Sequence, residues 1–140
     1  MITALDSNIL SAIFSREPMP LRIAVALDAE REDHQLVISP IVYSELLAHP
    51  AVEESYVLAF LSRNGVSIDF RFSDSVWTEC GRRFSQYAIR RRISSGDEPK
   101  RFLADFFVGS HALLHADRLM TMDPKRYRQD FAEVPLLIPV

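Results

Sequence analysis

The sequence predicts an α/β fold in which helices cover both faces of a parallel sheet of four or five short strands, a three-layer α/β/α arrangement. Short strand-like runs alternate with helical segments along the chain, which is typical of parallel strands joined by crossover helices. The strand-like runs are mostly apolar, as expected where both faces of a sheet are covered. No linker long enough to separate two parts is present, so residues 1–140 are expected to form one domain.

The first half of the chain is expected to hold three strands and four helices. In order, these are strand 2–5, helices 9–14 and 21–33, strand 35–39, helices 40–49 and 52–65, and strand 66–70. The first two strands are apolar runs, and the third alternates between apolar and polar residues. Ser39 before Pro40 predicts a helix start, because serine caps a helix and proline fits its first turn. Gly65 predicts a helix end.

The second half is expected to begin with a long helix. It starts at residue 73 or 74 and runs through residue 88, because its large apolar residues lie three and four positions apart. Residues 94–99 have the composition of a loop. The remaining elements are helix 104–116, strand 118–122, a short helix over 124–131 and strand 135–140.

The composition excludes several classes of protein. The single cysteine, Cys80, rules out an internal disulfide framework and a cysteine-based zinc site. No stretch approaches the roughly 18 apolar residues that span a membrane. The first ten residues lack the basic start of a signal peptide. We therefore expect a cytoplasmic protein that has no membrane partner.

The charge of the chain is uneven. A net charge of −3 argues against a generally basic nucleic-acid binder. Residues 82–101 nevertheless carry seven basic and two acidic side chains. Arg90, Arg91 and Arg92 in this segment are candidates for contact with a phosphate backbone. The alternative is that the segment is simply a solvated helix face.

Acidic residues stand at the ends of the predicted elements. Asp6 follows the first strand and Asp123 follows the fourth. The carboxyl ends of parallel strands share one edge of a sheet, so both should lie at that edge. Glu45 and Asp105 lie in helices expected to approach the same edge, among apolar or small neighbours three and four residues away. We expect the side chain of Glu45 to point toward the core.

Four carboxylates in one partly buried cleft would repel one another unless a cation neutralised them. A ligand set of oxygens alone suits Mg²⁺ or Mn²⁺. Such an ion can activate a water for in-line attack on phosphorus, so the chemistry indicated is phosphodiester hydrolysis. A second interpretation stays open, because Asp6, Asp105 and Asp123 all stand at plausible helix starts, where aspartate is a common cap.

Several motifs together resemble the PIN-domain family, and within it the VapC-type toxins of bacterial toxin–antitoxin pairs. They are "ALDSNIL", "ISPIVYSELLA", "LADFFVGSHAL" and "DRLMTMDPKRY", followed by a final "LLIP". Each motif is weakly specific alone, but their order and spacing cover nearly the whole chain. The resemblance implies a PIN-like domain and a cytoplasmic endoribonuclease that depends on Mg²⁺ or Mn²⁺. The family's catalytic and metal-binding acids fall on Asp6, Glu45, Asp105 and Asp123.

The resemblance also implies supporting residues and partners. Asn8 and Thr121 fall on positions whose side chains would hydrogen-bond the carboxylates and hold their orientation without binding the metal themselves. The substrate would be RNA, and Arg90–Arg92 could guide its phosphates. Members of the family usually form homodimers and are held inactive by a cognate antitoxin protein.

Two rival functions remain open. One is a non-catalytic α/β module that binds RNA or a protein partner, with the acids serving only as caps. The other is a phosphatase of the haloacid-dehalogenase type, since "LDSN" follows the first strand as its nucleophilic aspartate would. That chemistry requires a second aspartate two residues later, where this chain has Asn8.

Overall fold

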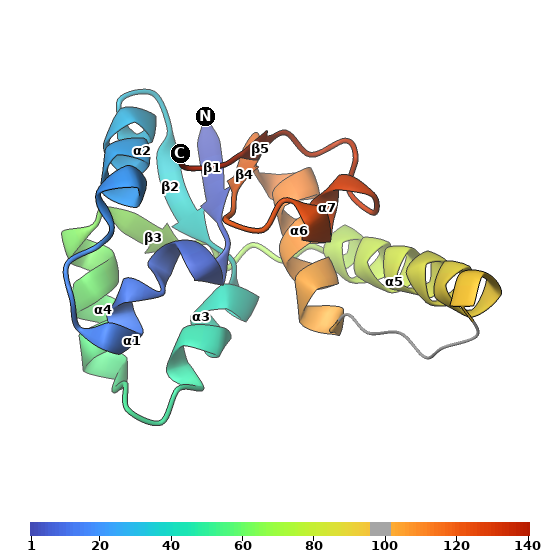
Figure 1. The fold of residues 1–140 in the computed structure, drawn as a ribbon, viewed down its shortest axis with the longest axis horizontal. Coiled ribbons are helices and arrows are strands. Elements are labelled where there is room, and N and C mark those ends of the chain that lie inside the picture. The colour runs from blue at the N-terminus through green and yellow to red at the C-terminus, as the bar shows by residue number, and fades with distance from the viewer. Residues whose placement is uncertain (96–101) are drawn as a thin grey trace.

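A computed structural model of the chain describes residues 1–95 and 102–140 (Figure 1). Its strands form one all-parallel, five-stranded sheet in the order β3-β2-β1-β4-β5. The strands are β1 (Ile2–Leu5), β2 (Gln35–Ile38), β3 (Val66–Ile68), β4 (Arg118–Met120) and β5 (Leu136–Leu137). The expected α/β fold with a parallel sheet flanked by helices is therefore confirmed.

The helices lie in the connections between the strands. They are the 3-10 helix η1 (Ser7–Leu10) and the α-helices α1 (Ala12–Ser15), α2 (Leu21–Arg31), α3 (Pro40–Leu47), α4 (Glu54–Arg63), α5 (Asp74–Ser95), α6 (Leu103–His115) and α7 (Lys125–Arg128). Crossovers between parallel strands are right-handed, so α1 to α4 lie on one face of the sheet and α5 to α7 on the other. In Figure 1, α2 and α4 lie beside β2 and β3, whereas α5, α6 and α7 lie toward β4 and β5.

The core extends over both faces of the sheet. Leu36 and Val37 are neighbours in β2 and point to opposite faces, yet they are only 1% and 2% exposed. Helices therefore cover both faces at the centre of the sheet. Helix α5 packs along α6 and extends away from the sheet (Figure 1).

The strand order creates a switch point at the centre of the sheet. The chain proceeds from β1 outward to β3, and then returns to the other side of β1 to form β4. Ligands of open parallel sheets bind at the carboxyl edge where such a reversal occurs. Asp6 follows β1 and Thr121 follows β4, so the switch point lies between two predicted site residues.

The element boundaries largely follow the sequence signals. The Ser39 side chain accepts a hydrogen bond from the Val42 N–H at 3.3 Å, with Pro40 in the first turn of α3. Gly65 follows α4 in the left-handed conformation, with a φ of 65°. No helix in the described ranges is long and apolar enough to cross a membrane.

Several boundaries differ from the sequence prediction. In place of one helix over 9–14, the chain forms η1 and then α1. Helix α5 continues to Ser95, so residues 94 and 95 of the expected loop are helical, and the rest of that segment lies outside the described residues. Strand β5 is a pair of residues, Leu136–Leu137, rather than the whole segment 135–140. It lies at the edge of the sheet, where pairing on one side only limits a strand's length.

Candidate active site

Asp6 is firmly held at the carboxyl edge of the sheet. It is 2% exposed. Its Oδ2 accepts hydrogen bonds from the Thr121 hydroxyl at 2.8 Å, the Tyr127 hydroxyl at 2.9 Å and the Asn8 amide at 3.3 Å. Its Oδ1 accepts from the Ser7 N–H at 2.9 Å. These donors stabilise the charged carboxylate and fix its orientation.

Thr121 and Asn8 also connect the ends of β1 and β4. The Thr121 Oγ1 accepts hydrogen bonds from the Asp123 N–H at 3.0 Å and from the Asn8 amide at 3.4 Å. The Asn8 Oδ1 in turn accepts from the Met122 N–H at 3.0 Å. The loop that carries Asp123 is therefore tied directly to the loop that carries Asp6.

Tyr127 was not singled out from the sequence. Its side chain is fully buried, and burial together with the charge of Asp6 raises the pKa of its hydroxyl well above the usual range. A weak signal existed, because Tyr127 and Phe131 lie four residues apart and could share one helix face. Nothing in that spacing shows that the hydroxyl contacts Asp6, which lies near the other end of the chain.

Glu45 differs from the sequence expectation. It was expected to point toward the core, but the residue is exposed. Partial burial of its carboxyl group and the negative charges of Asp6 and Asp105 raise its pKa, while Arg126 acts in the opposite direction. Glu45 therefore lies at the rim of the acidic edge, facing the other acids rather than the core.

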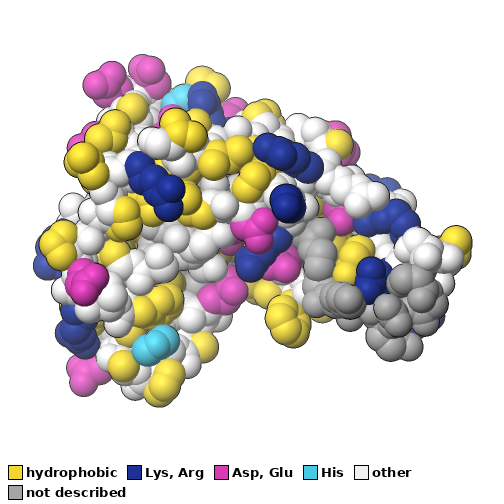
Figure 2. All heavy atoms as spheres, in the orientation of Figure 1, with side chains coloured by type: hydrophobic (Ala, Val, Ile, Leu, Met, Phe, Trp, Pro, Cys, Tyr) yellow, Lys and Arg dark blue, Asp and Glu magenta, His cyan; other side chains and the backbone are white. Residues whose placement is uncertain are grey.

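Asp105 and Asp123 share a basic partner. The Arg126 Nε lies 2.9 Å from Asp123 Oδ2, and its Nη1 lies 3.5 Å from Asp105 Oδ1. Asp6 also raises the pKa of this guanidinium, along with Asp105 and Asp123. In the space-filling view, acidic side chains lie beside basic ones near the middle of the face (Figure 2). Glu45 is thus in electrostatic range of Asp6 and Asp105, and Arg126, which the sequence interpretation missed, is in range of Asp6, Asp105 and Asp123.

The cap interpretation accounts for only one of these acids. Asp6 caps η1 through its bond from the Ser7 N–H. The cap positions of α6 and α7 are Phe102 and Pro124, and neither makes a side-chain cap bond. Neither Asp105 nor Asp123 therefore occupies the N-cap position of its helix.

The donor set fits a hard divalent cation. Carboxylate, hydroxyl and amide oxygens are the ligands that Mg²⁺ and Mn²⁺ prefer. In the described part of the chain, however, no three His, Cys, Asp or Glu side chains are already arranged to hold a metal ion. Arg126, paired with Asp105 and Asp123, supplies the positive charge in the arrangement observed.

The basic segment of α5 is partly neutralised. Arg83 is 8% exposed and pairs with Glu79 at 2.7 Å and Glu133 at 2.6 Å. Arg90 pairs with Asp130 at 2.8 Å. Arg91 and Arg92, the other candidates for phosphate contact, lie in the last turns of α5. Two of the segment's arginines therefore hold α5 to the C-terminal part of the chain, which weakens its interpretation as a phosphate-binding surface.

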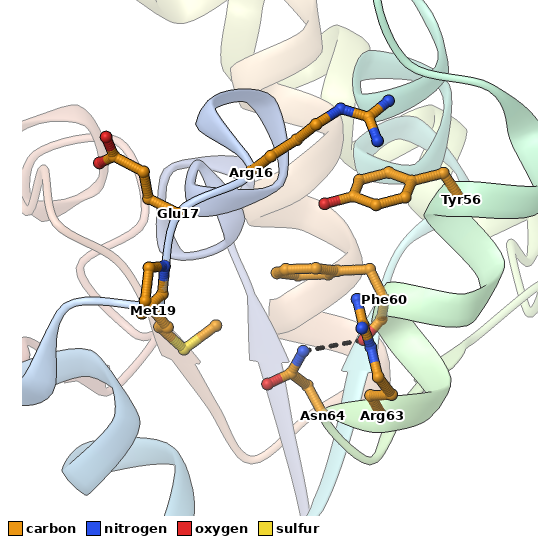
Figure 3. A pocket seen from close by; sticks show the side chains of 8 residues that line it. Arg16, Glu17, Met19, Tyr56, Phe60, Arg63 and Asn64 are labelled. Atoms are coloured by element: carbon orange, nitrogen blue, oxygen red, sulfur yellow. Dashed lines mark hydrogen bonds between the residues drawn. The ribbon is translucent and has the colours of Figure 1, made fainter.

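A separate hollow of about 450 Å³ lies between α4 and the segment that joins α1 to α2 (Figure 3). The Arg16 guanidinium lies 4.2 Å from the centre of the Tyr56 ring, and Phe60 and Arg63 line the same hollow. None of the four predicted acids lines it. It is therefore distinct from the acidic edge.

Solved structures show the same fold over the whole chain. VapBC2 from Rickettsia felis, solved with a DNA fragment from its promoter, has a chain with 23% identity and a TM-score of 0.68, over 99% of this chain and 98% of that one. The matching chain of VapBC-1 from nontypeable Haemophilus influenzae has 23% identity and a TM-score of 0.67, with the same coverage of both chains. The matching chain of FitAcB from Neisseria gonorrhoeae has 21% identity and a TM-score of 0.63, again with the same coverage.

Sequence comparison gives the family. No curated protein sequence matches the chain significantly. The PIN domain model matches residues 3–132, a range that contains Asp6, Glu45, Asp105 and Asp123. Because this match covers most of the chain, and because the fold agrees with it, the chain belongs to the PIN-domain family.

Proposed function

We propose that the chain is a metal-dependent endoribonuclease and the toxin of a toxin–antitoxin pair, acting in the cytoplasm. The observation that carries this proposal is the electrostatic interaction of Glu45 with Asp6 and Asp105 near the switch point of the sheet, where Arg126 pairs with Asp123. Carboxylates that lie close together ionise at a cost, and a bound cation would offset that cost. Membership of the PIN-domain family supports a nuclease in particular.

The proposed mechanism assigns a part to each group at the edge. Asp6, Glu45 and Asp105, with Asp123, would hold Mg²⁺ or Mn²⁺, which would supply an activated water and stabilise charge on the phosphate. The Asp6 carboxylate keeps a fixed orientation, because the side chains of Thr121, Asn8 and Tyr127 donate hydrogen bonds to it.

The partners follow from the structural neighbours. These include VapBC2, VapBC-1 and a toxin–antitoxin complex from Klebsiella pneumoniae. By analogy, we propose that a cognate antitoxin protein inhibits this chain and that the chain forms a homodimer. Co-expression with the product of a neighbouring small gene should relieve growth arrest, and light scattering should give twice the chain mass.

Replacement of single acids tests the nuclease. The purified chain should cleave RNA with Mn²⁺ and lose this activity with a chelator. Asp6→Asn, Glu45→Gln and Asp105→Asn should each lower the cleavage rate by about 100-fold or more, since a metal ligand contributes several kcal/mol to the transition state. Asp33→Asn is the matched control, because Asp33 is exposed and lies just before β2, at the opposite edge of the sheet.

One observation favours the non-catalytic alternative, namely that Arg126 already neutralises Asp105 and Asp123. Under that alternative the three acid variants change stability by about 1 kcal/mol and bind RNA or the partner as before. Sequencing of RNA ends after brief expression separates the two, because only a nuclease creates new ends. A stable phosphoryl group on Asp6 would instead indicate the phosphatase chemistry.

A further inference from the structure

A basic side chain stands among the acids of the proposed metal site. Arg126 lies in the short helix α7 and directs Nε to Asp123 Oδ2 at 2.9 Å and Nη1 to Asp105 Oδ1 at 3.5 Å. Its side chain is 42% exposed, so it reaches the edge from the solvent side. The arginine comes from this chain itself, which makes it a permanent component of the site.

Arg126 and a divalent cation would use the same oxygens. Asp105 is one of the acids proposed to hold the metal, and Asp123 would bind the same metal directly or through a water molecule. A guanidinium within 4 Å of these oxygens and a dication bound to them would repel each other strongly. The two cations therefore cannot both keep their full contacts with Asp105 and Asp123.

The local structure allows the side chain to move while its backbone stays in place. Tyr127, the next residue, is fully buried and donates its hydroxyl to Asp6 at 2.9 Å. This contact fixes α7 against the sheet edge. The long, partly exposed side chain of Arg126 can change rotamer without disturbing that anchor.

We infer that Arg126 is a further catalytic residue, which neutralises the acids in the metal-free chain and transfers its contacts to the RNA phosphate when the metal is bound. This inference rests on the proposed nuclease function. The planar guanidinium matches phosphate oxygens through two parallel hydrogen bonds. Placed beside the reacting phosphate, it stabilises the negative charge that grows there during attack, as arginines supplied in cis do in other phosphoryl transfers.

The experiment measures metal binding and cleavage separately. Mn²⁺ affinity is titrated calorimetrically without RNA, and single-turnover cleavage is measured at saturating Mn²⁺. Arg126→Gln should bind Mn²⁺ about tenfold more tightly, because a competing unit charge is gone. It should cleave RNA about 100-fold more slowly, because the phosphate loses its partner. Arg128→Gln is the matched control, since Arg128 is an exposed arginine of the same helix, and both quantities should stay at wild-type values.

Opposite changes in the two measurements distinguish this role from a structural one, which would weaken metal binding and cleavage together. The inference is overturned if Arg126→Gln cleaves as fast as the wild type, or if its Mn²⁺ affinity is unchanged or weaker. If that variant fails to fold, Arg126→Lys decides, because it keeps the charge but loses the planar fork. Its Mn²⁺ affinity should stay near wild type while cleavage falls about tenfold, and unchanged cleavage overturns the inference. A wild-type chain that binds Mn²⁺ but cleaves no RNA would instead refute the proposed function.

Discussion

At the scale of single residues, the hydroxyl of Tyr127 is the least expected part of the site. It approaches Asp6 from a short helix near the C-terminus and adds a third donor to one carboxylate oxygen. Replacing a group that orients a metal-binding carboxylate typically lowers metal affinity or activity by about 10-fold to 100-fold. Tyr127 thus connects the final helix of the chain to the first acid.

Tyr127→Phe tests this connection. Loss of the hydroxyl should lower Mn²⁺ affinity and cleavage about 10-fold to 100-fold, since Asp6 loses part of its fixed orientation. The free energy of unfolding should fall by about 1 kcal/mol. A calorimetric titration measures the Mn²⁺ affinity, and chemical denaturation measures the free energy of unfolding. Tyr43→Phe serves as control, because the Tyr43 hydroxyl donates to Glu54 at 3.4 Å on the surface. A Tyr127 variant indistinguishable from this control would contradict the proposed support of Asp6.

Replacement of Ser110 is predicted to raise the free energy of unfolding rather than lower it. It is fully buried in α6, and within the described ranges its Oγ has no hydrogen-bond partner. A buried hydroxyl without a partner is destabilising. Ser110→Ala should therefore raise the free energy of unfolding by up to about 1 kcal/mol. Urea melts measure this, and a loss of stability would show that the hydroxyl is satisfied by water.

At the scale of elements, the contact between α6 and the C-terminal segment positions the acid edge. Gly109 lies one helical turn after Asp105, and a Cβ built on it would lie 2.5 Å from the Phe131 ring. Such a distance is impossible without movement of the ring. Phe131 is itself 1% exposed and packed against Phe106, so it has little room to move.

Gly109→Ala should therefore destabilise the chain although alanine favours helices. Overpacking of this kind costs about 1–3 kcal/mol, against a propensity gain of about 1 kcal/mol. Thermal melts should show a lower Tm. Gly81→Ala in α5 is the matched control, because nothing lies within 4 Å of its added Cβ, and that variant should be neutral or stabilised. Equal effects at both glycines would show that the Phe131 contact is unimportant.

The sequence predicted those elements whose signals are local. The β1 run, the Ser39 cap with Pro40 and the left-handed Gly65 all lie where they were expected. The acids at the strand ends could be placed at one edge because parallel topology alone puts them there. The predicted sheet and its flanking helices depend only on such local patterns and on their order.

The features that could not be predicted depend on contacts between distant segments. Glu45 has apolar neighbours along its helix, but its exposure is set by what α3 packs against, which the helix sequence does not contain. Arg126 stands in a run of basic residues, and only its neighbours in space distinguish it from Arg128. Spacing along the chain carries no information about such partners.

At the scale of the whole molecule, a buried polar cluster joins the two sides of the sheet. Asp69 follows β3, and its Oδ2 lies 2.9 Å from His111 Nε2 in α6. Arg71 binds both oxygens of Asp69 at 2.9 Å and donates to the His115 carbonyl. The connection from β3 to α5 is therefore held against the helix that carries Asp105.

This cluster predicts a loss of stability in acid. Burial alone would raise the pKa of Asp69, but the hydrogen bonds from Arg71 and the contact with His111 hold it well below its usual range. Its stabilising contribution is thus complete above about pH 4, the ordinary pKa of an unfolded aspartate, and is lost as the pH falls toward the lower folded value.

Asp69→Asn should lower the free energy of unfolding by about 1–3 kcal/mol at pH 7. The gap from wild type should shrink as the pH falls below about 4, because the wild-type carboxylate then begins to lose its advantage. Urea melts between pH 7 and pH 2 measure it, with the exposed Asp33→Asn as reference. A gap that stays constant over this range would show that the charge of Asp69 is not the stabilising group.

The acidic edge takes its parts from both ends of the chain, since Asp6 follows the first strand whereas Thr121, Asp123 and Tyr127 follow the fourth. During translation, the ribosome must therefore have made the chain as far as α7 before these groups can meet. A nascent or prematurely terminated polypeptide without α7 lacks the assembled edge, so the chemistry of the edge requires β4 and α7 to have been made. For a protein that would attack RNA, this order of assembly spares the message and the ribosome that are producing it.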